Sequence, residues 1–165
     1  MTFKEHVCQY DPDLFKDDRG YLKVISEDKS LGMSYKESYS KRGVFRGMHI
    51  QTPPYSQVKH IMIMEGKIID YLIVLDRKSE HFGEIFSQEI AHSNKIYKIP
   101  NYCAHGYYAL QESVIRYMCI GQYSEENEIS INECHHGLDN LIISKKDREG
   151  ISLKKAKELF KEVSW

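Results

Sequence analysis

Short apolar segments separated by turn residues recur along most of the chain. They are rich in Ile, Val, Tyr and Met, and they cover residues 21–25, 43–51, 58–64, 67–75, 85–90, 95–99, 105–110 and 114–123. Many short strands at such regular spacing are typical of an all-β sandwich or barrel. The pattern therefore predicts an all-β fold.

The residues between these segments have the chemistry of tight turns. Glu65-Gly66 separates two segments, Phe82-Gly83 ends another connection, and Asn94 precedes the segment 95–99. Gly and Asn adopt the backbone conformations that turns require. We therefore expect antiparallel hairpins at these positions.

One segment is apolar on both of its faces. Residues 68–75 carry a single charge, at Asp70, within an otherwise apolar run. A strand with two apolar faces is buried on both sides. We expect this strand to lie between two layers of the structure.

The end of the chain has a different period. From 152 to 163 the apolar residues recur at helical spacing with lysines between them, at Leu153, Ala156, Leu159, Phe160 and Val163. This spacing predicts one C-terminal amphipathic helix.

Composition limits the classes of partner. The 165 residues fit one domain spanning 1–165, and 23 Lys and Arg balance 24 Asp and Glu. A balanced charge favours neither nucleic acid nor an anionic membrane as partner. The longest apolar run is shorter than the roughly 20 residues that span a bilayer, and the first residues lack a signal-peptide pattern. We therefore expect a soluble cytoplasmic protein.

The four cysteines are widely separated and form no C-x-x-C pair, at Cys8, Cys103, Cys119 and Cys134. This spacing fits neither a zinc site nor a disulfide framework. We expect reduced, mostly buried thiols, with a catalytic Cys103 beside His105 as the alternative.

The densest polar cluster lies in the segment 43–51. In a regular strand Arg46 and Met48 would point to one face, and Gly47, His49 and Gln51 to the other. Lys59 follows His49 ten residues later on another predicted strand. The pattern indicates polar groups inside a barrel mouth, although a structural histidine with one hydrogen bond explains His49 equally well.

A second cluster surrounds His105, between Pro100 and Gly106, and a single histidine in such a turn is more often structural. Metal-binding barrels commonly offer two neighbouring histidines, a glutamate and a distant histidine. Here His49 is followed by Gln51, and Lys59 adds a positive charge. Such a set is a poor ligand sphere for a divalent metal, so no metal is predicted.

Taken in order, these motifs resemble the dTDP-4-dehydrorhamnose 3,5-epimerase family. The core of the resemblance is Arg46-Gly-Met-His-Ile-Gln51, with Lys59 and Ala104-His-Gly106. It extends from about Phe15 to Asp147 through further motifs: Phe15-Lys-Asp-Asp-Arg-Gly20, Asp70, Asp76-Arg-Lys-Ser79, Phe82-Gly83, Tyr117-Met-Cys119, Tyr123-Ser124 and Ser144-Lys-Lys-Asp147.

The resemblance implies a fold and an activity. The fold is a double-stranded β-helix, that is, a cupin-like jelly roll, usually in a homodimer. The implied reaction is cofactor-independent epimerisation at C3, C5 or both of a nucleotide-linked 4-keto-6-deoxyhexose. Such sugars serve polysaccharide biosynthesis, for example of O-antigen or capsule.

The resemblance also assigns roles to individual residues. His49 is the proton-abstracting base, and histidine suits this role because its pKa lies near working pH. Asp147 orients His49, and Lys59 stabilises the enolate. Tyr123 donates the returning proton, with Tyr117 as the nearby alternative. The substrate-binding residues are Arg19, Arg46, Gln51 and His105, the arginines suiting diphosphate oxygens.

The chain departs from the family at several positions. Ile50 replaces the usual Tyr between His49 and Gln51, Asn101-Tyr102 replaces Gly-Phe, and Glu125 replaces a Pro. The stretch 132–137 replaces a Trp- and Asp-containing one. These changes leave the nucleotide and the sugar open, since dTDP, CDP and GDP are all used by relatives.

Two rival interpretations stay open. A nucleotide-sugar 3,4-ketoisomerase of the same fold typically carries two histidines in the His-x-His position, where Gln51 stands here. A non-catalytic carbohydrate-binding or dimerisation module would keep the barrel without the proton-transfer residues.

Overall fold

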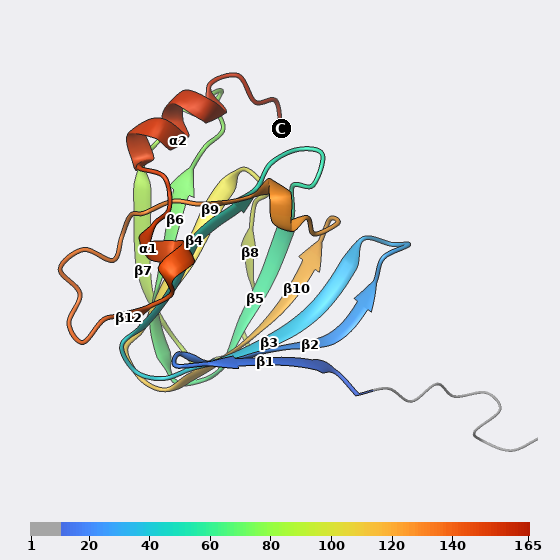
Figure 1. Cartoon of the computed structure of the whole chain (residues 1–165), viewed down its shortest axis with the longest axis vertical. Helices are drawn as coiled ribbons and strands as arrows, with labels where there is room; N and C mark the ends of the chain where they lie inside the picture. The colour runs from blue at the N-terminus through green and yellow to red at the C-terminus, as the bar shows by residue number, and fades with distance from the viewer. Residues whose placement is uncertain (1–10) are drawn as a thin grey trace, which may run out of the picture.

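The computed structural model describes residues 11–165, which form two facing β-sheets (Figure 1). Sheet A has the order β1 (Asp13–Asp17), β2 (Gly20–Asp28), β3 (Met33–Ser40), β10 (Ser113–Ile120), β5 (Val58–Glu65), β8 (Tyr97–Ile99). Sheet B has the order β11 (Glu128–Ser130), β4 (Val44–Gln51), β9 (Cys103–Ala109), β6 (Lys67–Val74), β7 (Ile85–Ala91), and β12 (Ile142–Ile143) pairs with β4. The predicted all-β fold is confirmed.

Within residues 11–165, three short helical segments accompany the sheets: η2 (Glu125–Asn127), α1 (Lys145–Arg148) and α2 (Leu153–Phe160). The predicted C-terminal helix is confirmed as α2, which begins after Ser152, whose hydroxyl accepts a hydrogen bond from the Lys155 amide. The sequence pattern did not predict α1, because four residues are too few to show a helical period.

The predicted hairpin at Glu65-Gly66 is wrong. This turn joins β5 of sheet A to β6 of sheet B, so the two strands do not pair with each other. The turn after β6 does close an antiparallel hairpin, since β6 and β7 pair from Lys67 and Ala91 onward. Turn chemistry marks where the chain reverses, but it does not distinguish a hairpin from a crossing between layers.

Strand β3 was also missing from the predicted strands. Its inward-facing residues are polar, at Ser34, Lys36, Ser38 and Ser40, so it lacks the apolar alternation that marks a strand. Their orientation follows from the register, because Ser38 lies opposite Ile115 of the core between the sheets. The polar inner face of β3 thus belongs to the interior of the barrel.

Two apolar clusters hold the layers together. One lies between the sheets and includes Ile61, Ile68 and Ile115. The other lies on the outer side of sheet B, where α2 packs against it through Ala156 and Phe160 (Figure 1). Strand β6 contributes to both clusters, which confirms that it lies between two layers.

The described cysteines are unpaired thiols: Cys103, Cys119 and Cys134. Burial raises the pKa of the Cys103 thiol to about 11, so it is protonated at neutral pH. A protonated thiol is a weak nucleophile, which favours the packing role for Cys103. Cys8 lies outside the described residues.

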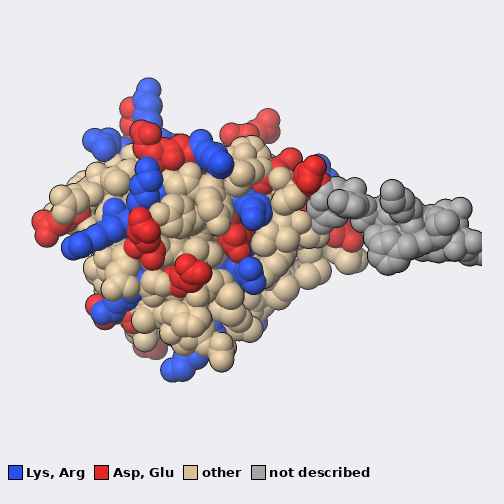
Figure 2. Space-filling model, turned by 90° about the horizontal axis from the view of Figure 1, so that it is seen from below, with Lys and Arg blue, Asp and Glu red and all other residues tan. Residues whose placement is uncertain are grey.

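Charged side chains of both signs are interspersed on the surface shown in Figure 2, without a patch of one sign. Between residues 11 and 165, no helix has the length and apolar character needed to cross a bilayer.

Phe160 tests the contribution of α2. Its side chain is fully buried, and its ring stacks on Trp165 with centroids 5.5 Å apart. We expect Phe160→Ala to lower the free energy of unfolding by about 3–5 kcal/mol, because it leaves a cavity beneath the helix. The neighbouring Leu159 is 47% exposed, and Leu159→Ala should cost less than about 1 kcal/mol. Equal losses in urea unfolding would contradict this packing.

Candidate active site

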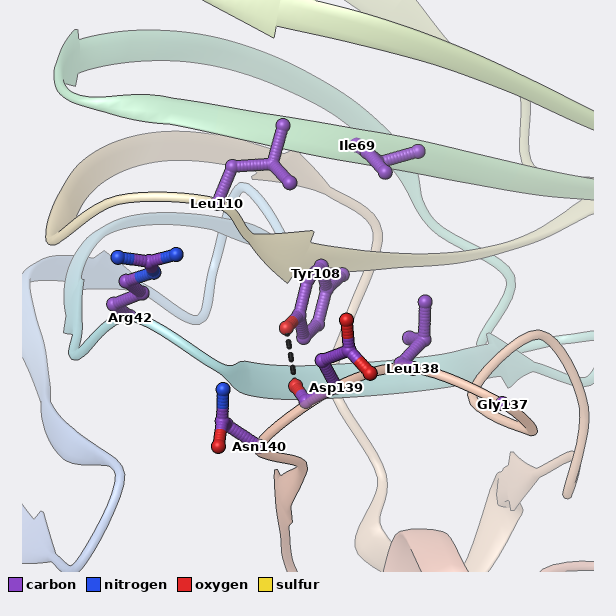
Figure 3. Close-up of a pocket in the computed structure, with 8 residues that line it drawn as sticks. All are labelled: Arg42, Ile69, Tyr108, Leu110, Gly137, Leu138, Asp139 and Asn140. Carbon is purple, nitrogen blue, oxygen red and sulfur yellow. Dashed lines mark hydrogen bonds between the residues drawn. The ribbon is translucent and has the colours of Figure 1, made fainter.

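A hollow of about 540 Å³ on the outer side of sheet B does not contain the predicted site (Figure 3). It lies between the sheet and the loop 137–140, where the Tyr108 hydroxyl donates a hydrogen bond of 2.5 Å to the Asp139 carbonyl. Its lining residues are Arg42, Ile69, Tyr108, Leu110, Gly137, Leu138, Asp139 and Asn140. None of these was a candidate, and the predicted residues that do belong to sheet B, among them His49 and His105, face its opposite side.

An irregularity in β4 decides which side chains point inward. Phe45, Met48 and Ile50 all pack in the outer core, so successive outward-facing residues of β4 are first three and then two positions apart. The pairing of β4 with β9 shifts register between Arg46 and His49. Arg46 therefore lies on the same inner face as His49, and the expectation that Arg46 would share a face with Met48 is wrong.

Two glycines make this irregularity possible. A Cβ atom on Gly47 would lie 2.5 Å from the Cα atom of Gly106 on β9, and the φ of Gly47 is +124°. Side chains at these positions would force the two strands apart. The glycines thus allow β4 to bring Arg46 and His49 to one face.

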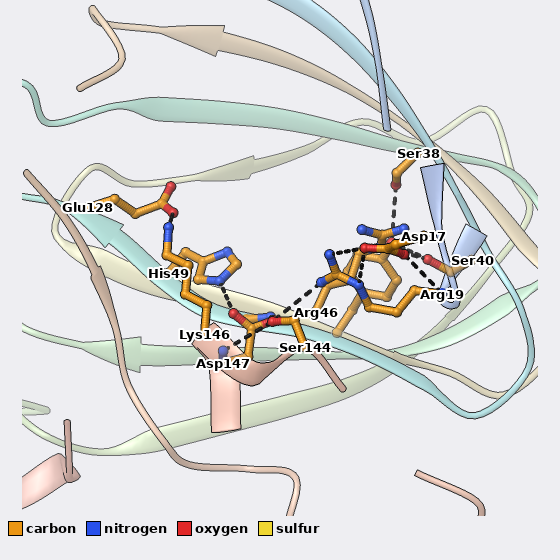
Figure 4. A network of polar contacts seen from close by, with 12 residues as sticks. Asp17, Arg19, Ser38, Ser40, Arg46, His49, Glu128, Ser144, Lys146 and Asp147 are labelled. Carbon is orange, nitrogen blue, oxygen red and sulfur yellow. Dashed lines mark hydrogen bonds and ion pairs between the residues drawn. The ribbon is translucent and has the colours of Figure 1, made fainter. Parts of the chain in front are cut away.

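His49 and Asp147 form a hydrogen-bonded pair, as shown in Figure 4. The distance from His49 Nε2 to Asp147 Oδ1 is 2.6 Å, and Asp147 is only 1% exposed. Helix α1 holds Asp147 in place, since the Asp147 amide donates to the Ser144 hydroxyl at its N-terminus. With Nε2–H donating to the carboxylate, Nδ1 of a neutral His49 keeps its lone pair for a proton.

The environment keeps Asp147 ionised. Burial alone would raise its pKa, but the hydrogen bond and charge of His49, the Gly47 amide and the Ser144 hydroxyl hold the pKa below its ordinary value. Arg19 Nη1 adds a positive charge 3.6 Å from Asp147 Oδ2. A fixed carboxylate of this kind stabilises the imidazolium that His49 becomes when it takes a proton.

His105 forms a second pair of the same kind. Its Nε2 lies 2.7 Å from Asp70 Oδ1, and both side chains are buried. His105 lies in β9 directly opposite His49 of β4. The two imidazoles therefore face the interior from adjacent strands, each held by its own carboxylate.

Lys59 enters the interior from the other sheet. It lies opposite the buried Cys119 in the pairing of β5 with β10. Burial lowers the pKa of Lys59, while Cys119, Glu128 and Asp70 act in the opposite direction. No carboxylate of residues 11–165 lies within ion-pair distance of its ammonium group.

The two predicted arginines have partners within the protein (Figure 4). Arg46 Nε donates to the Ser40 hydroxyl at 2.9 Å, and its Nη2 donates to the Tyr39 carbonyl at 3.2 Å. Arg19 Nη2 donates to Asp17 Oδ2 at 2.6 Å. Both lie near the inner face, with much of their donor capacity already used.

Gln51 links β4, the strand that carries His49, to the loop after β10. Its side chain accepts a hydrogen bond from the Ser124 amide and donates to Glu128 at 3.4 Å. Glu128 also forms a short ion pair with Lys146, the residue before Asp147. Together these contacts fix α1, β4 and β11 relative to one another.

The two candidate tyrosines lie in different surroundings. Tyr117 faces inward on β10, and its hydroxyl lies 2.9 Å from Ser38 Oγ. Burial holds the pKa of Tyr117 well above its ordinary value. Tyr123 lies beyond the end of β10 and is 44% exposed. Burial also raises the pKa of Tyr123, and Glu128 adds to this effect.

Several residues near this site were not among the candidates: Lys36, Asp70 and Glu128 of the interior, and the half-exposed Lys146 beside it. Asp70 had a usable signal, since it is the only charge in an apolar strand and such a charge needs a buried partner. Glu128 had none, because a glutamate in a run of charged residues resembles any surface glutamate. No group of three His, Cys, Asp or Glu side chains within residues 11–165 has the spacing of a metal site.

Comparison with known proteins places these residues in a family. A family profile described as dTDP-4-dehydrorhamnose 3,5-epimerase matches residues 3–155. The curated dTDP-4-dehydrorhamnose 3,5-epimerase of Methanothermobacter thermautotrophicus is 31% identical over 157 residues, which covers 84% of each chain.

Solved structures agree with this assignment. The dTDP-4-dehydrorhamnose 3,5-epimerase from Sulfolobus tokodaii matches with a TM-score of 0.69 and 29% identity, covering 86% of this chain and 87% of that one. The Bacillus anthracis enzyme, solved with TDP and PPi bound, matches with a TM-score of 0.64 and 28% identity, covering 84% and 89%. The cupin-like jelly roll is thereby confirmed, and the chain belongs to the dTDP-4-dehydrorhamnose 3,5-epimerase family.

Proposed function

We propose that this protein epimerises a nucleotide-linked 4-keto-6-deoxyhexose, at C3, C5 or both, without a cofactor. The observation that carries the proposal is the hydrogen bond between His49 and the buried Asp147. Family membership supports the substrate class, and we extend it to a cytoplasmic role in making deoxysugars for polysaccharides such as O-antigen or capsule.

The first step is removal of a proton next to the C4 ketone. His49 Nδ1 takes this proton, and the C–H electron pair moves into the ring to give an enolate with its charge on the C4 oxygen. Asp147 stabilises the imidazolium that results. A histidine–carboxylate pair contributes about 10²–10⁴-fold to a step of this kind.

Lys59 is the proposed electrophile for the enolate oxygen. Its ammonium group has no acidic partner within ion-pair distance among residues 11–165, so its charge is available to the substrate. A preplaced cation in a water-poor site stabilises developing negative charge by several kcal/mol. Burial is the largest influence and lowers the pKa of Lys59, while Cys119, Glu128 and Asp70 act in the opposite direction and favour the protonated form that this role requires.

Inversion requires a proton donor on the other side of the sugar ring. The sequence resemblance assigned this role to Tyr123, with Tyr117 as the alternative. Burial and register favour Tyr117, because its side chain leaves sheet A toward the interior that His49 faces from sheet B, and because burial raises its pKa and keeps the phenol protonated. We propose that Tyr117 is the proton donor. We propose that Tyr123, which lies beyond the end of β10, lines the part of the site that binds the nucleotide.

The base is tested by hydrogen exchange in deuterated water, with 4-keto-6-deoxy sugars on dTDP, CDP and GDP. We expect deuterium at C3, C5 or both with the wild type, and a loss of about 10²–10⁴-fold with His49→Asn. His136→Asn, on the loop 131–141, is the matched control and should exchange normally. No incorporation with any substrate would exclude epimerisation, and a 3-keto product would identify a ketoisomerase instead.

The two tyrosines form a second test. In Tyr117→Phe, His49 still removes the proton but the opposite face receives none, so we expect deuterium exchange to exceed epimer formation. Tyr123→Phe should keep the ratio of deuterium exchange to epimer formation at its wild-type value, because the change removes only the hydroxyl of a partly exposed side chain. The reverse outcome in NMR time courses would return the donor role to Tyr123.

We also propose that the protein is a homodimer. The outer face of sheet A exposes three neighbouring apolar side chains, Tyr35, Met118 and Ile120, at 36%, 37% and 39%. Beside them Arg116 Nε donates to Glu37 Oε2 at 2.9 Å, so the charges on this face are already paired. A contiguous apolar patch around a neutralised ion pair suits contact with a second copy.

Sedimentation analysis tests the homodimer. We expect a dimer for the wild type at micromolar concentration and a monomer for Met118→Asp, because the new charge would be buried without a partner. Ile85→Asp, on an exposed strand position of sheet B, should stay dimeric. A monomeric wild type, or a dimeric Met118→Asp, would contradict this assignment of the interface.

A further inference from the structure

A row of hydrogen-bonded side chains leads from Tyr117 to Arg46 across the interior. The Tyr117 hydroxyl lies 2.9 Å from Ser38 Oγ, and Ser38 Oγ lies 3.1 Å from the Tyr107 hydroxyl. The Tyr107 hydroxyl lies 2.8 Å from Ser40 Oγ. Arg46 Nε then donates to Ser40 Oγ at 2.9 Å (Figure 4). The row joins β3 and β10 of sheet A to β4 and β9 of sheet B.

Arg46 fixes the direction of hydrogen bonding at its end of the row. A guanidinium group only donates, so Ser40 Oγ accepts from Arg46 Nε. If Tyr107 also donated to Ser40, the hydroxyl hydrogen of the fully buried Ser40 would have no acceptor within hydrogen-bonding distance in residues 11–165. A buried donor without an acceptor is costly. Ser40 therefore donates to Tyr107.

The same reasoning sets the direction of the next two hydrogen bonds. Tyr107 accepts from Ser40, so Ser38 is the acceptor left for the Tyr107 hydrogen. Ser38 in turn has Tyr117 left as its acceptor. Tyr107 and Ser38 are at most 2% exposed, so bulk water offers neither of them another partner. All three hydroxyls therefore donate in the direction of Tyr117.

Tyr117 ends the row at the interior that His49 faces. Unlike the other hydroxyl side chains of the row, it is only partly buried. Its oxygen accepts from Ser38, which leaves its own hydrogen for a ligand. Burial and Tyr107 raise the pKa of Tyr117, whereas the hydrogen bond from Ser38 and the charge of Arg46 lower it. These last two contacts thus favour the phenolate.

We infer that the row positions the proton donor of the proposed reaction. It directs the O–H bond of Tyr117 toward the carbon that is reprotonated, and it stabilises the phenolate that remains. Arg46, Ser40 and Tyr107 are positioning residues in this arrangement, because they act through Tyr117. The inference rests on the proposed function, in which Tyr117 is the donor. It gives Arg46 a role in proton transfer, where the sequence resemblance assigned it to substrate binding.

The row needs no rearrangement when the proton leaves. The enolate carbon takes the proton of Tyr117, and the O–H electron pair stays on the phenol oxygen, to which Ser38 already donates. The hydroxyls behind Ser38 connect the new negative charge to the positive charge of Arg46, and such preplaced donors stabilise developing charge. Over one turnover His49 gains one proton and Tyr117 loses one, and exchange with water restores both.

Tyr107→Phe tests the inference, because it removes one oxygen from the middle of the row and keeps the ring in the core. Ser38 then loses the donor that orients it, and Tyr117 can donate to Ser38 instead of the substrate. In deuterated water we expect the ratio of deuterium exchange to epimer formation to rise about tenfold above the wild type. KM should stay within about twofold, since the buried Tyr107 hydroxyl contacts only the two serines.

Tyr108→Phe is the matched control. Tyr108 follows Tyr107 on β9 but faces the outer side of sheet B, where its hydroxyl donates to the Asp139 carbonyl. This variant also loses a hydrogen-bonded phenol oxygen, yet it should keep the wild-type ratio of exchange to epimer formation. Ser40→Ala interrupts the row beside Arg46 and should raise the ratio as Tyr107→Phe does.

The double variant Tyr107→Phe/Tyr117→Phe separates positioning from a general structural effect. If the row acts through Tyr117, Tyr107→Phe should not change the ratio further once Tyr117 is replaced. Additive effects in the double variant, or equal ratios in Tyr107→Phe and Tyr108→Phe, would overturn the inference. An unchanged ratio in Tyr117→Phe alone would also overturn it, while deuterium exchange that depends on His49 would still support epimerisation.

Discussion

The hydrogen bond between His49 and Asp147 joins parts of the chain 98 residues apart, and the rest of the candidate site is arranged around it. Asp147 lies in α1, and the ion pair of Lys146 with Glu128 ties the same helix to β11. Gln51 extends the connection from Glu128 to the loop after β10. One short helix thus sets the orientation of the base, the position of β11 and the start of the loop that carries Tyr123. Removing the carboxylate would disturb both the chemistry of His49 and the electrostatic reason for α1 to pack there.

The inner faces of the two sheets divide the barrel into an apolar and a polar part. Ile61, Ile68 and Ile115 fill one part, while charged and hydroxyl side chains from β3, β4, β5 and β9 fill the other. Burying so many polar groups is costly, and it is tolerated where a ligand or paired side chains satisfy their hydrogen bonds. The close approach of β4 and β9 at Gly47 and Gly106 contributes to this division, because it allows Arg46 to face the polar part.

The sequence was sufficient for the features that depend on local periodicity. The apolar strands and α2 follow from spacing alone, and the motif series around His49 and Lys59 indicated the family. Features that depend on contacts between distant segments were not accessible in this way. Strand β3 was missed because its inner residues are serines and a lysine. The Glu65-Gly66 turn was assigned to a hairpin because a turn that crosses between the two sheets has the same residue types. Arg46 was assigned to the wrong face of β4 because a register shift between two strands cannot be seen in the sequence of one. Lys36 had no signal at all, since only the pairing of β3 with β10 places it inside.

The position of Asp147 along the chain has a consequence for the order in which the protein acquires its activity during synthesis. All twelve strands of the described residues, β11 and β12 included, precede α1 along the chain, so both sheets are synthesised before the residue that orients His49. Up to that moment the barrel holds an imidazole without its carboxylate, together with the lysines and tyrosines of the interior. The outer core is also incomplete at that stage, because Ala156 and Phe160 of α2 follow Asp147. The same final segment of the described residues therefore completes the packing on sheet B and the orientation of His49.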